Sequence, residues 1–577
     1  MLCLPILIFA ACMPQNPDPI SIAEAAPTPS AGKVEVANLP ELIAQYQADQ
    51  STLERVWSFP FSNAKHSRLA ALHADWLARL DQVDFESLPR RSQIDWLMLR
   101  NQVDHELRSC RLDQGKHAET KKLVPFVGPL VELLELRARR QPVQAEQSAE
   151  ILHAAVAQIQ ATKKQFQDTP PSVSPTVANR AANELGSLRN GLARWMRYSE
   201  DYDPLITWWN RAPWEKLESE LRSYEAFLRS DVGGLRENDP DQLIGDPIGR
   251  DALLAELQYE RIPYTPEELI EIAERELAWC NQQRELAAKE MGLGNDWKAA
   301  QLEVKKAHED PGGQPEMIRM LANEAVQFLE ERDLLTIPDL AKECWRMDMM
   351  SPARQKFTPY FTGGEVISIS YPTEGMQHED KLMTMRGNNL HYSRATVHHE
   401  LIPGHHLQGY MAQRWNPHRR AFSTPFLIEG WALYWELKLW DLGFAQSAQD
   451  RIGMLFWRSH RCARIIFSLN FHLGKWSPQE CVEFLLDQVG HERRNATAEV
   501  RRSIQGGYGP LYQCAYMVGG IQLRGLHREL VTEGSWLEKD FHDAVLQQNS
   551  IPIEFMRAAL TDEPLSREFP VQWKFDG

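Results

Sequence analysis

The sequence has 577 residues, of which 43% are hydrophobic and 25% charged, and these proportions are ordinary for a globular protein of roughly two to four domains. Its formal net charge at pH 7 is -16. A nucleic-acid-binding protein needs a basic surface, so this charge argues against a nucleic-acid partner, whereas a mildly acidic surface is normal for a soluble enzyme.

The N-terminus carries an apolar run over residues 2–11 that ends at Cys12. About ten apolar residues are too few to cross a bilayer, which takes about twenty, but they suit the hydrophobic region of a signal peptide. The tetrapeptide Phe-Ala-Ala-Cys that ends at Cys12 resembles a bacterial lipobox, whose cysteine is lipidated after cleavage. We therefore predict a signal peptide over 1–12, export to the cell envelope, on the periplasmic side or at the outer membrane, and a membrane anchor through a lipid on Cys12. A plain secretory signal and a misplaced start codon are the alternatives.

Residues 13–35 are rich in Pro, Ala and Ser. Such a composition buries too little surface to fold, so we predict a disordered tether that holds the folded domain away from the membrane. After the tether, no stretch reaches about eighteen consecutive apolar residues, and the sequence predicts no transmembrane helix.

Six cysteines follow Cys12 without any paired C-x-x-C spacing. This distribution excludes a recognisable cysteine zinc site. Export would permit disulfide bonds, but we predict buried free thiols for Cys110, Cys280, Cys344, Cys462, Cys481 and Cys514.

Helical patterns dominate the chain after the tether. In one clear example, Thr265 and Glu268 are placed to form a capping box around Pro266, and apolar residues then recur at helical spacing. Neither an internal repeat nor an alternation of strands and helices is seen. The sequence therefore predicts a mostly α-helical fold.

We expect this helical fold to have two parts. A helical N-terminal half would cover residues 36–250, and a helical catalytic half would cover residues 251–577. The stretch Asn238–Gly249, which contains Pro and Gly residues, is the expected boundary between them.

Residues 365–371 show a different pattern, in which apolar and polar side chains alternate with a period of two, as in a half-buried strand. Gly363-Gly364 before this segment and Pro372 after it mark turns. We predict a small antiparallel β element here. Polypeptide substrates often bind by adding a strand to an exposed edge, so this element is either such an edge or a purely structural hairpin.

Histidines are concentrated downstream in the motif H-E-x-x-P-G-H-H, which runs from His399 to His406. A zinc hydrolase needs three protein ligands, usually His and Glu, and leaves a fourth position for water. The usual motif is H-E-x-x-H on one helix, where residues i and i+4 share a face and the intervening Glu is the general base. The motif therefore predicts a Zn2+ site, with His399 as the first ligand and Glu400 as the base.

The spacing between the histidines is too long for a regular helix. His399 and His405 would lie about 240° apart around the axis, and His406 would lie about 10.5 Å along it, too far to share one ion. Pro403 lacks the N–H that would bond to the His399 carbonyl, and Gly404 adopts conformations closed to other residues. We predict that Pro403-Gly404 interrupts the helix and that His405 is the second ligand, with His406 beside the ligands. The opposite assignment of the two histidines stays open.

The third ligand is expected to be an acidic residue on a following helix. Glu429 and Glu436 lie seven residues apart in an almost wholly apolar segment, so they share one helical face. Buried carboxylates need a partner such as a metal ion or a histidine. We predict Glu429 as the third ligand and Glu436 as a neighbouring residue that orients a ligating histidine.

These motifs resemble a known family. H-E-x-x-P-G-H-H-x-Q from His399 to Gln408, followed by E-G-W-A-x-Y-x-E from Glu429 to Glu436, resembles the bacterial family called domain of unknown function 885. That family has many lipoprotein-like members and is similar to helical zinc peptidases of the thimet oligopeptidase, neurolysin and angiotensin-converting-enzyme type. The resemblance, which covers roughly residues 355–560, implies a large multi-helix zincin-like fold, a bound Zn2+ and a peptide substrate.

A further family segment has an Arg followed by P-G-Q-A-x-S-Y-K-I-G. Here Arg502 is followed by a similar segment that keeps Tyr516 but departs from the pattern at several positions. The resemblance implies that Tyr516 donates a hydrogen bond to an oxyanion and that Arg502 binds a substrate carboxylate. Because Tyr508, Tyr512 and Tyr516 are spaced four apart, an aromatic stripe in the core is the structural alternative.

We therefore expect a zinc metallopeptidase that hydrolyses short peptides by attack of a metal-activated water, with Glu400 as the general base. Two other interpretations are a metal-binding or scaffolding lipoprotein of the same fold without turnover, and a hydrolase of a non-peptide amide. Glu400 favours an enzyme, because a metal-binding protein has no use for a carboxylate beside its ligand.

Overall fold

The computed structural model describes residues 38–236, 242–355, 360–505 and 507–576, and these are mostly helical, which confirms the predicted fold class. Asn38–Gly577 group as one compact unit. The predicted signal peptide, the lipidation site and the tether lie outside the described residues, as do residues 238–241 of the expected boundary. The division of the chain near residue 250 stays a prediction.

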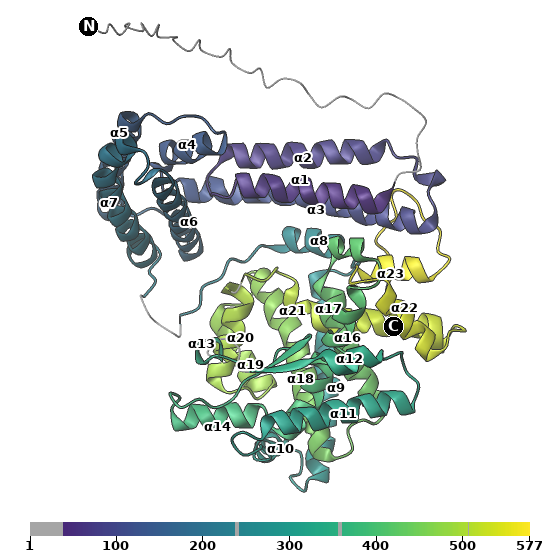
Figure 1. The fold of residues 1–577 in the computed structure, drawn as a ribbon. Coiled ribbons are helices and arrows are strands. Elements are labelled where there is room, and N and C mark those ends of the chain that lie inside the picture. The colour runs from purple at the N-terminus through teal and green to yellow at the C-terminus, as the bar shows by residue number, and fades with distance from the viewer. Residues whose placement is uncertain (1–37, 237–241, 356–359, 506, 577) are drawn as a thin grey trace, which may run out of the picture. The chain divides into compact units, whose positions relative to one another are not determined.

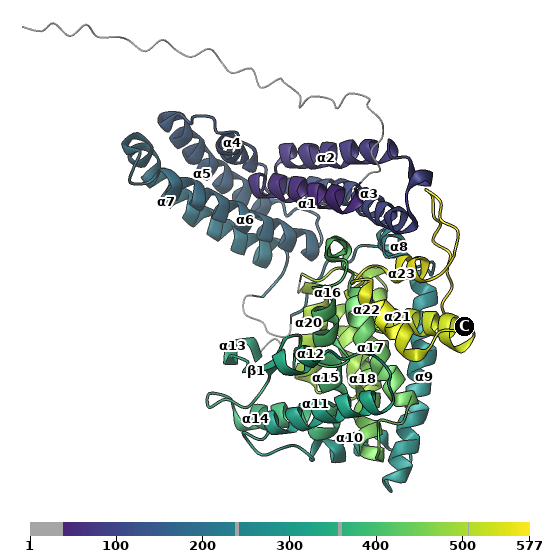
Figure 2. The ribbon, with the colours of Figure 1, turned by 45° about the vertical axis from the view of Figure 1, so that its right-hand side comes forward.

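The first seven helices form two groups. The first group lies side by side in Figures 1 and 2 and consists of α1 (Leu39–Val56), α2 (Asn63–Asp81) and α3 (Arg90–Lys121). The second group packs around its own cluster of buried apolar side chains and consists of α4 (Val127–Ala138), α5 (Ala145–Asp168), α6 (Pro175–Ser199) and α7 (Pro204–Phe227). Short helical turns, η1 (Phe85–Ser87) and η2 (Leu228–Val232), follow α2 and α7.

The later helices pack around α18 (Ala448–His472), in which every residue from Ile452 onward is buried. A helix buried on all sides belongs to the core of a large protein. Its neighbours are α9 (Pro266–Glu290), α10 (Trp297–Lys305), α15 (Leu390–Glu400), α19 (Pro478–Gln488) and α21 (Tyr512–His527). The remaining elements are α8 (Arg250–Tyr259), α11 (Gln314–Glu331), α12 (Asp339–Cys344), α13 (Pro352–Gln355), α14 (His378–Gly387), α16 (His405–Ala412), η3 (Pro417–Phe422), α17 (Pro425–Asp441), α20 (Arg493–Gln505), η4 (Arg528–Thr532), α22 (Glu538–Gln547) and α23 (Ile553–Leu560).

Helices α17 and α21 cross at two glycines. A Cβ atom added to Gly430 would lie 2.6 Å from the Cα of Gly519, and one added to Gly519 would overlap the backbone of α17. Only glycine permits such a close approach of two backbones. Because α17 carries Glu429 and α21 carries Tyr512 and Tyr516, this crossing fixes the distance between the predicted ligand and the two tyrosines.

We expect Gly519→Ala to lower the free energy of unfolding by at least about 2 kcal/mol, because the added methyl group must push the two helices apart. Denaturant unfolding followed by circular dichroism measures the change. Gly128→Ala is the matched control, since a Cβ at Gly128 in α4 has open space around it. Equal stability of the two variants would show that the crossing tolerates a side chain.

The predicted strand is present as β2 (Val366–Ile369), which pairs with β1 (Arg346–Met349). The pairing is parallel, so the predicted antiparallel element is wrong. Parallel strands need a crossover connection of about a dozen residues or more, and residues 350–365, which include α13, supply it. Among the described residues, antiparallel pairing is confined to one bridge, between Thr362 and Ser368 of β2.

Other local predictions are confirmed. At the start of α9, the Thr265 hydroxyl accepts from the Glu268 backbone at 3.2 Å, and the Glu268 carboxylate accepts from the Thr265 backbone at 2.7 Å. The six cysteines of the described chain are free thiols, as predicted. Four of them are buried, but Cys110 and Cys344 are only partly buried, so the predicted burial is wrong for these two. Among the described helices, none combines the length and the apolar character that a bilayer crossing requires.

Candidate metal centre

The helix that begins the histidine motif stops where the sequence predicts. α15 ends at Glu400, and α16 begins at His405. The Ile402–Pro403 peptide is cis, and the Gly404 N–H donates to the carbonyl of His398 at 3.0 Å. A side chain at Gly404 would overlap the backbone of His399, so this position needs glycine. The predicted interruption of the helix is confirmed. It turns the chain so that the side chains of His399 and His405 both lie near Glu429.

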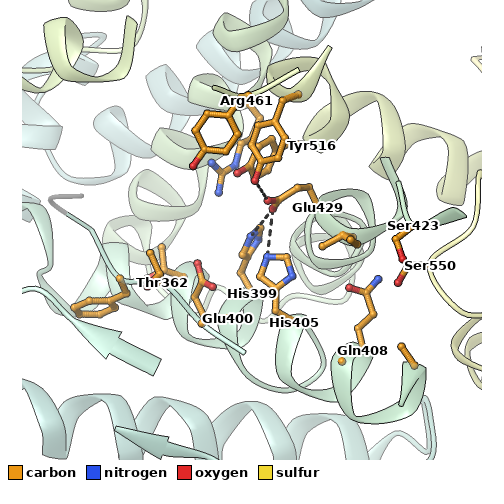
Figure 3. Close-up of a pocket in the computed structure, with 18 of the residues that line it drawn as sticks. Thr362, His399, Glu400, His405, Gln408, Ser423, Glu429, Arg461, Tyr516 and Ser550 are labelled. Atoms are coloured by element: carbon orange, nitrogen blue, oxygen red, sulfur yellow. Dashed lines mark hydrogen bonds and ion pairs between the residues drawn. The ribbon is translucent and has the colours of Figure 1, made fainter. Parts of the chain in front are cut away.

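His399, His405 and Glu429 come together although they lie on α15, α16 and α17 (Figure 3). The Oε2 atom of Glu429 lies 3.3 Å from Nε2 of His405 and 3.8 Å from Nε2 of His399. Ligand atoms that lie about 2.0–2.2 Å from a tetrahedral zinc ion are roughly 3.3–3.6 Å apart. The His405–Glu429 distance falls within this range and the His399–Glu429 distance is slightly longer, while the three ligand atoms all lie within 4.8 Å of one another. The three residues could therefore hold a single zinc ion with two imidazoles and one carboxylate as ligands.

Two hydrogen bonds orient these side chains. Nδ1 of His399 donates to Oε1 of Glu436 at 2.7 Å, which directs the Nε2 atom of His399 toward Glu429. The hydroxyl of Tyr512 donates to Oε1 of Glu429 at 2.5 Å, which leaves Oε2 for the histidines. A carboxylate that accepts the second N–H of a ligating histidine fixes its ring and its tautomer. Glu436 thus occupies the position predicted for it.

Charges in the cluster shift one another's pKa values. Burial lowers the pKa of His399, but the interactions with Glu429 and Glu436 outweigh burial and raise it to about 9. Burial raises the pKa of Glu429, but the charge of His405 and the contacts with both histidines bring it well below its ordinary value. Glu429 is therefore ionised near neutral pH, the form in which a carboxylate binds a metal.

Glu400 points into the cavity that the cluster lines, which has a volume of about 560 Å³ (Figure 3). Gly363 packs directly against it, since a Cβ added to Gly363 would lie 2.5 Å from Oε2 of Glu400. The Gly364 N–H donates to the backbone carbonyl of Glu400 at 3.1 Å. Burial raises the pKa of Glu400. The glycine segment before β2 therefore fixes the position of the predicted base.

The cavity wall beside Glu400 is formed by residues 360–363 and not by the predicted substrate edge, 365–371. The backbone of Thr362 pairs with that of Ser368 in β2 through one antiparallel bridge. A polypeptide that binds in this cavity by strand pairing would therefore pair with residues 360–363, which precede the predicted edge, 365–371, in the chain.

His406 points away from the cluster. Its Nε2 atom donates to the carbonyl of Ala341 at 2.7 Å and lies 3.8 Å from the thiol of Cys344. Adjacent residues on a helix point about 100° apart, so His405 and His406 at the start of α16 face different surroundings. The geometry favours His405 as the second ligand, and the predicted place of His406 beside the ligands is wrong.

The tyrosine segment lies over the cluster, on the other side from α16. The ring of Tyr516 stacks on that of His399 with centroids 6.3 Å apart, and burial together with Glu429 raises its pKa. Tyr508, Tyr512, Tyr516 and Arg502 all line the cavity. Tyr516 also belongs to a buried apolar cluster, and Tyr512 packs against that cluster, whereas Tyr508 is 39% exposed. The part of the stripe nearest Tyr516 therefore packs in the core as well as lining the cavity, and the role of Tyr516 stays a prediction.

Two residues of the site were missed in the sequence. Tyr512 bonds to Glu429, and its position four residues before Tyr516 was a signal that both share a helical face. Arg461 of α18 lines the cavity and lies against Tyr516, with its guanidinium carbon 4.4 Å from the ring centroid. It belongs to a row of arginines spaced three apart, Arg458, Arg461 and Arg464, in a helix that the structure buries.

Comparisons with known proteins show the family and the fold. A family model described as "Bacterial protein of unknown function (DUF885)" matches residues 45–560. A putative lipoprotein of unknown function from Shewanella oneidensis is similar in structure, with 14% identity, a TM-score of 0.68 and coverage of 91% of this chain and 100% of that chain. A putative lipoprotein from Colwellia psychrerythraea has 15% identity and a TM-score of 0.55 over 90% of this chain and 97% of that chain. No curated protein matches the sequence.

Proposed function

The chain belongs to the bacterial protein family DUF885, and we propose that it is a zinc-dependent hydrolase of short peptides. One observation carries the proposal. Two histidines and a glutamate at zinc-ligand spacing share a cavity with Glu400, the carboxylate that directly follows the first histidine. As part of this proposal, the chain is related to thimet oligopeptidase, neurolysin and angiotensin-converting enzyme and shares their zincin-like fold.

His399, His405 and Glu429 would hold the ion. When bound, zinc supplies Lewis acidity, which polarises a carbonyl group and makes water a stronger nucleophile near neutral pH. Glu436 accepts a hydrogen bond from the Nδ1–H group of His399, so Nε2 is the nitrogen that would lose its proton and bind the ion. Tyr512 restrains Glu429 by donating to its second oxygen.

The chain's other residues would move the protons. Glu400 accepts a proton from water as the water oxygen bonds to the peptide carbon, and it passes that proton to the amide nitrogen as the C–N bond breaks. Tyr516 stays protonated because its pKa is raised, and it would donate a hydrogen bond to the carbonyl oxygen as negative charge develops there. Residues 360–363 would line the bound peptide on the Glu400 side.

We also propose that the protein works in the cell envelope, anchored through a lipid on Cys12. The N-terminal sequence resembles a lipobox, and the two similar solved structures are those of putative lipoproteins. An anchored peptidase would meet peptides that reach the envelope rather than those inside the cell.

Metal content and hydrolysis together test the proposed function. After reconstitution, the purified protein should contain about one zinc per chain by mass spectrometry. It should hydrolyse short peptides, lose that activity with 1,10-phenanthroline and regain it when zinc is added. Protein that binds no stoichiometric zinc would contradict the proposal. Zinc without any hydrolysis would support the scaffolding alternative, and zinc with hydrolysis of non-peptide amides alone would support the third interpretation.

A further inference from the structure

The cavity has a cationic wall opposite α16. Arg461 and Arg464 of α18 and Arg502 of α20 all line it. Arg461 and Arg464 are only 6% and 3% exposed. Taking a guanidinium group out of water is costly unless an anion or a set of hydrogen bonds compensates for the lost hydration. Arg461 and Arg464 therefore need an anionic partner or several hydrogen-bond acceptors.

Two arginines in the same row of α18 have such a partner within the protein. Arg458 lies 2.7 Å from a carboxylate oxygen of Glu276. Arg464 donates from Nε to Oε1 of Glu499, also at 2.7 Å. Both distances are typical of charge-assisted hydrogen bonds. These two side chains show how α18 normally compensates a buried arginine.

Arg461, between them, lacks this compensation. The closest carboxylate oxygen, Oε1 of Glu436, is 3.8 Å from its guanidinium group and already accepts the proton of His399 Nδ1. In the described part of the chain Arg461 donates no hydrogen bond, and its buried Nε atom has no partner. Its contacts are with the faces of Trp457 and Tyr516. A buried cation with free donors at a cavity is a binding site for an anion.

The position of Arg461 limits what that anion can be. Its guanidinium carbon lies 4.4 Å from the ring centroid of Tyr516, which is 6.3 Å from that of His399. Arg461 is therefore within about three extended residue lengths of the metal cluster. Arg502 faces the same cavity with a buried Nε atom that has no hydrogen-bond partner.

We propose that Arg461, together with Arg502 of the same cavity, binds the free C-terminal carboxylate of a peptide, so that the protein releases short C-terminal fragments. The planar fork of arginine donors matches the two oxygens of a carboxylate. The short distance to the cluster leaves space for one or two residues between the carboxylate and the bond to be cut. This inference rests on the proposed peptidase function and adds the substrate class: peptides with an unblocked C-terminus.

Two peptides that differ only at the C-terminus, one a free acid and the other an amide, test the inference on the zinc-loaded wild-type protein. The free acid should have a kcat/KM about 10- to 100-fold higher, the effect expected of one charge-assisted hydrogen-bonded pair. Isothermal titration of the two peptides into the zinc-loaded Glu400→Gln variant gives a binding measurement that needs no turnover. The free acid should bind more tightly by a similar factor.

Variants test whether Arg461 is the residue that recognises the C-terminal carboxylate. Arg461→Met should remove most of the preference for the free acid, measured as the ratio of kcat/KM for the acid to that for the amide, and Arg461→Lys should restore part of this ratio. Arg420→Met is the matched control, because Arg420 lines the same cavity but is exposed. It should retain the preference. Zinc content and circular dichroism of each variant report on folding.

The outcomes separate this inference from the proposed function. Equal cleavage and equal binding of acid and amide by the wild-type protein would overturn the carboxylate site and leave the peptidase proposal standing. An amidated peptide with an acidic side chain that binds as tightly as the free acid would also overturn it, because recognition would then be of side chains. Absence of cleavage in all peptides, with tighter binding of the free acid, would refute the peptidase proposal and keep the anion site.

Discussion

Replacing His405 by alanine should release zinc, whereas replacing His406 should leave the zinc affinity close to that of the unmodified protein. His405 Nε2 lies 3.3 Å from Glu429 Oε2, but His406 Nε2 bonds to the Ala341 carbonyl. Loss of a residue that merely supports a ligand costs about 10- to 100-fold in metal affinity, and loss of the ligand itself should exceed this range. Competition with a chromophoric chelator measures the affinities.

The two variants control for each other, because they remove the same side chain from neighbouring positions of α16. His406→Ala loses a buried hydrogen bond, so a modest drop in thermal stability is expected for it. If His406→Ala released the metal and His405→Ala retained it, the ligand assignment would be reversed. Release in both variants would indicate that α16 as a whole had shifted, and circular dichroism would show this.

Glu400→Gln should retain zinc and lose about 10²- to 10⁴-fold in kcat, the usual contribution of a general base. The amide has nearly the same shape as the carboxylate but cannot accept a proton from water. Because Gly363 packs directly on this side chain, the replacement should keep its position. Initial rates with a short peptide, on protein of verified zinc content, give the value.

Glu365→Gln is the control for this second prediction, since it makes the same chemical change at a carboxylate that is 55% exposed and pairs with Arg346 on the surface. Its rate should match that of the unmodified protein. A Glu400→Gln protein that keeps zinc and full activity would remove Glu400 as the base. A variant that loses zinc would show instead that Glu400 supports the ligands.

Local features of the site were predictable from the sequence because they depend on neighbours in the chain. Pro403 interrupts the helix because it lacks a backbone N–H and its ring clashes with the preceding turn. A carboxylate in an apolar helix indicates a buried group, such as a metal ion or a histidine, that compensates its charge. The structure places Glu429 and Glu436 on one face of α17 as the spacing of seven requires. The choice between His405 and His406 was left open, because it depends on what surrounds α16.

Features that depend on distant segments could not be predicted. The partner of β2 is β1, whose paired residues lie twenty positions upstream across a crossover, and an alternating pattern carries no information on the direction of its partner. The same is true of Tyr512, whose hydroxyl meets Glu429 only because α17 and α21 cross closely. The sequence around Arg461 does not show whether this arginine is paired with a carboxylate, because its distance from Glu436 and other acidic residues depends on the tertiary structure.

The contact between Gly430 and Gly519 determines which functional properties a substitution can change separately. No side chain lies between the two backbones there, so nothing can repack when either helix moves. The proposed metal ligand on α17 and the tyrosines on α21 are therefore held in place by the same helix crossing. Damage at this crossing would remove metal retention and turnover together, whereas changes around Glu400, which rests on the separate Gly363 segment, can alter turnover alone.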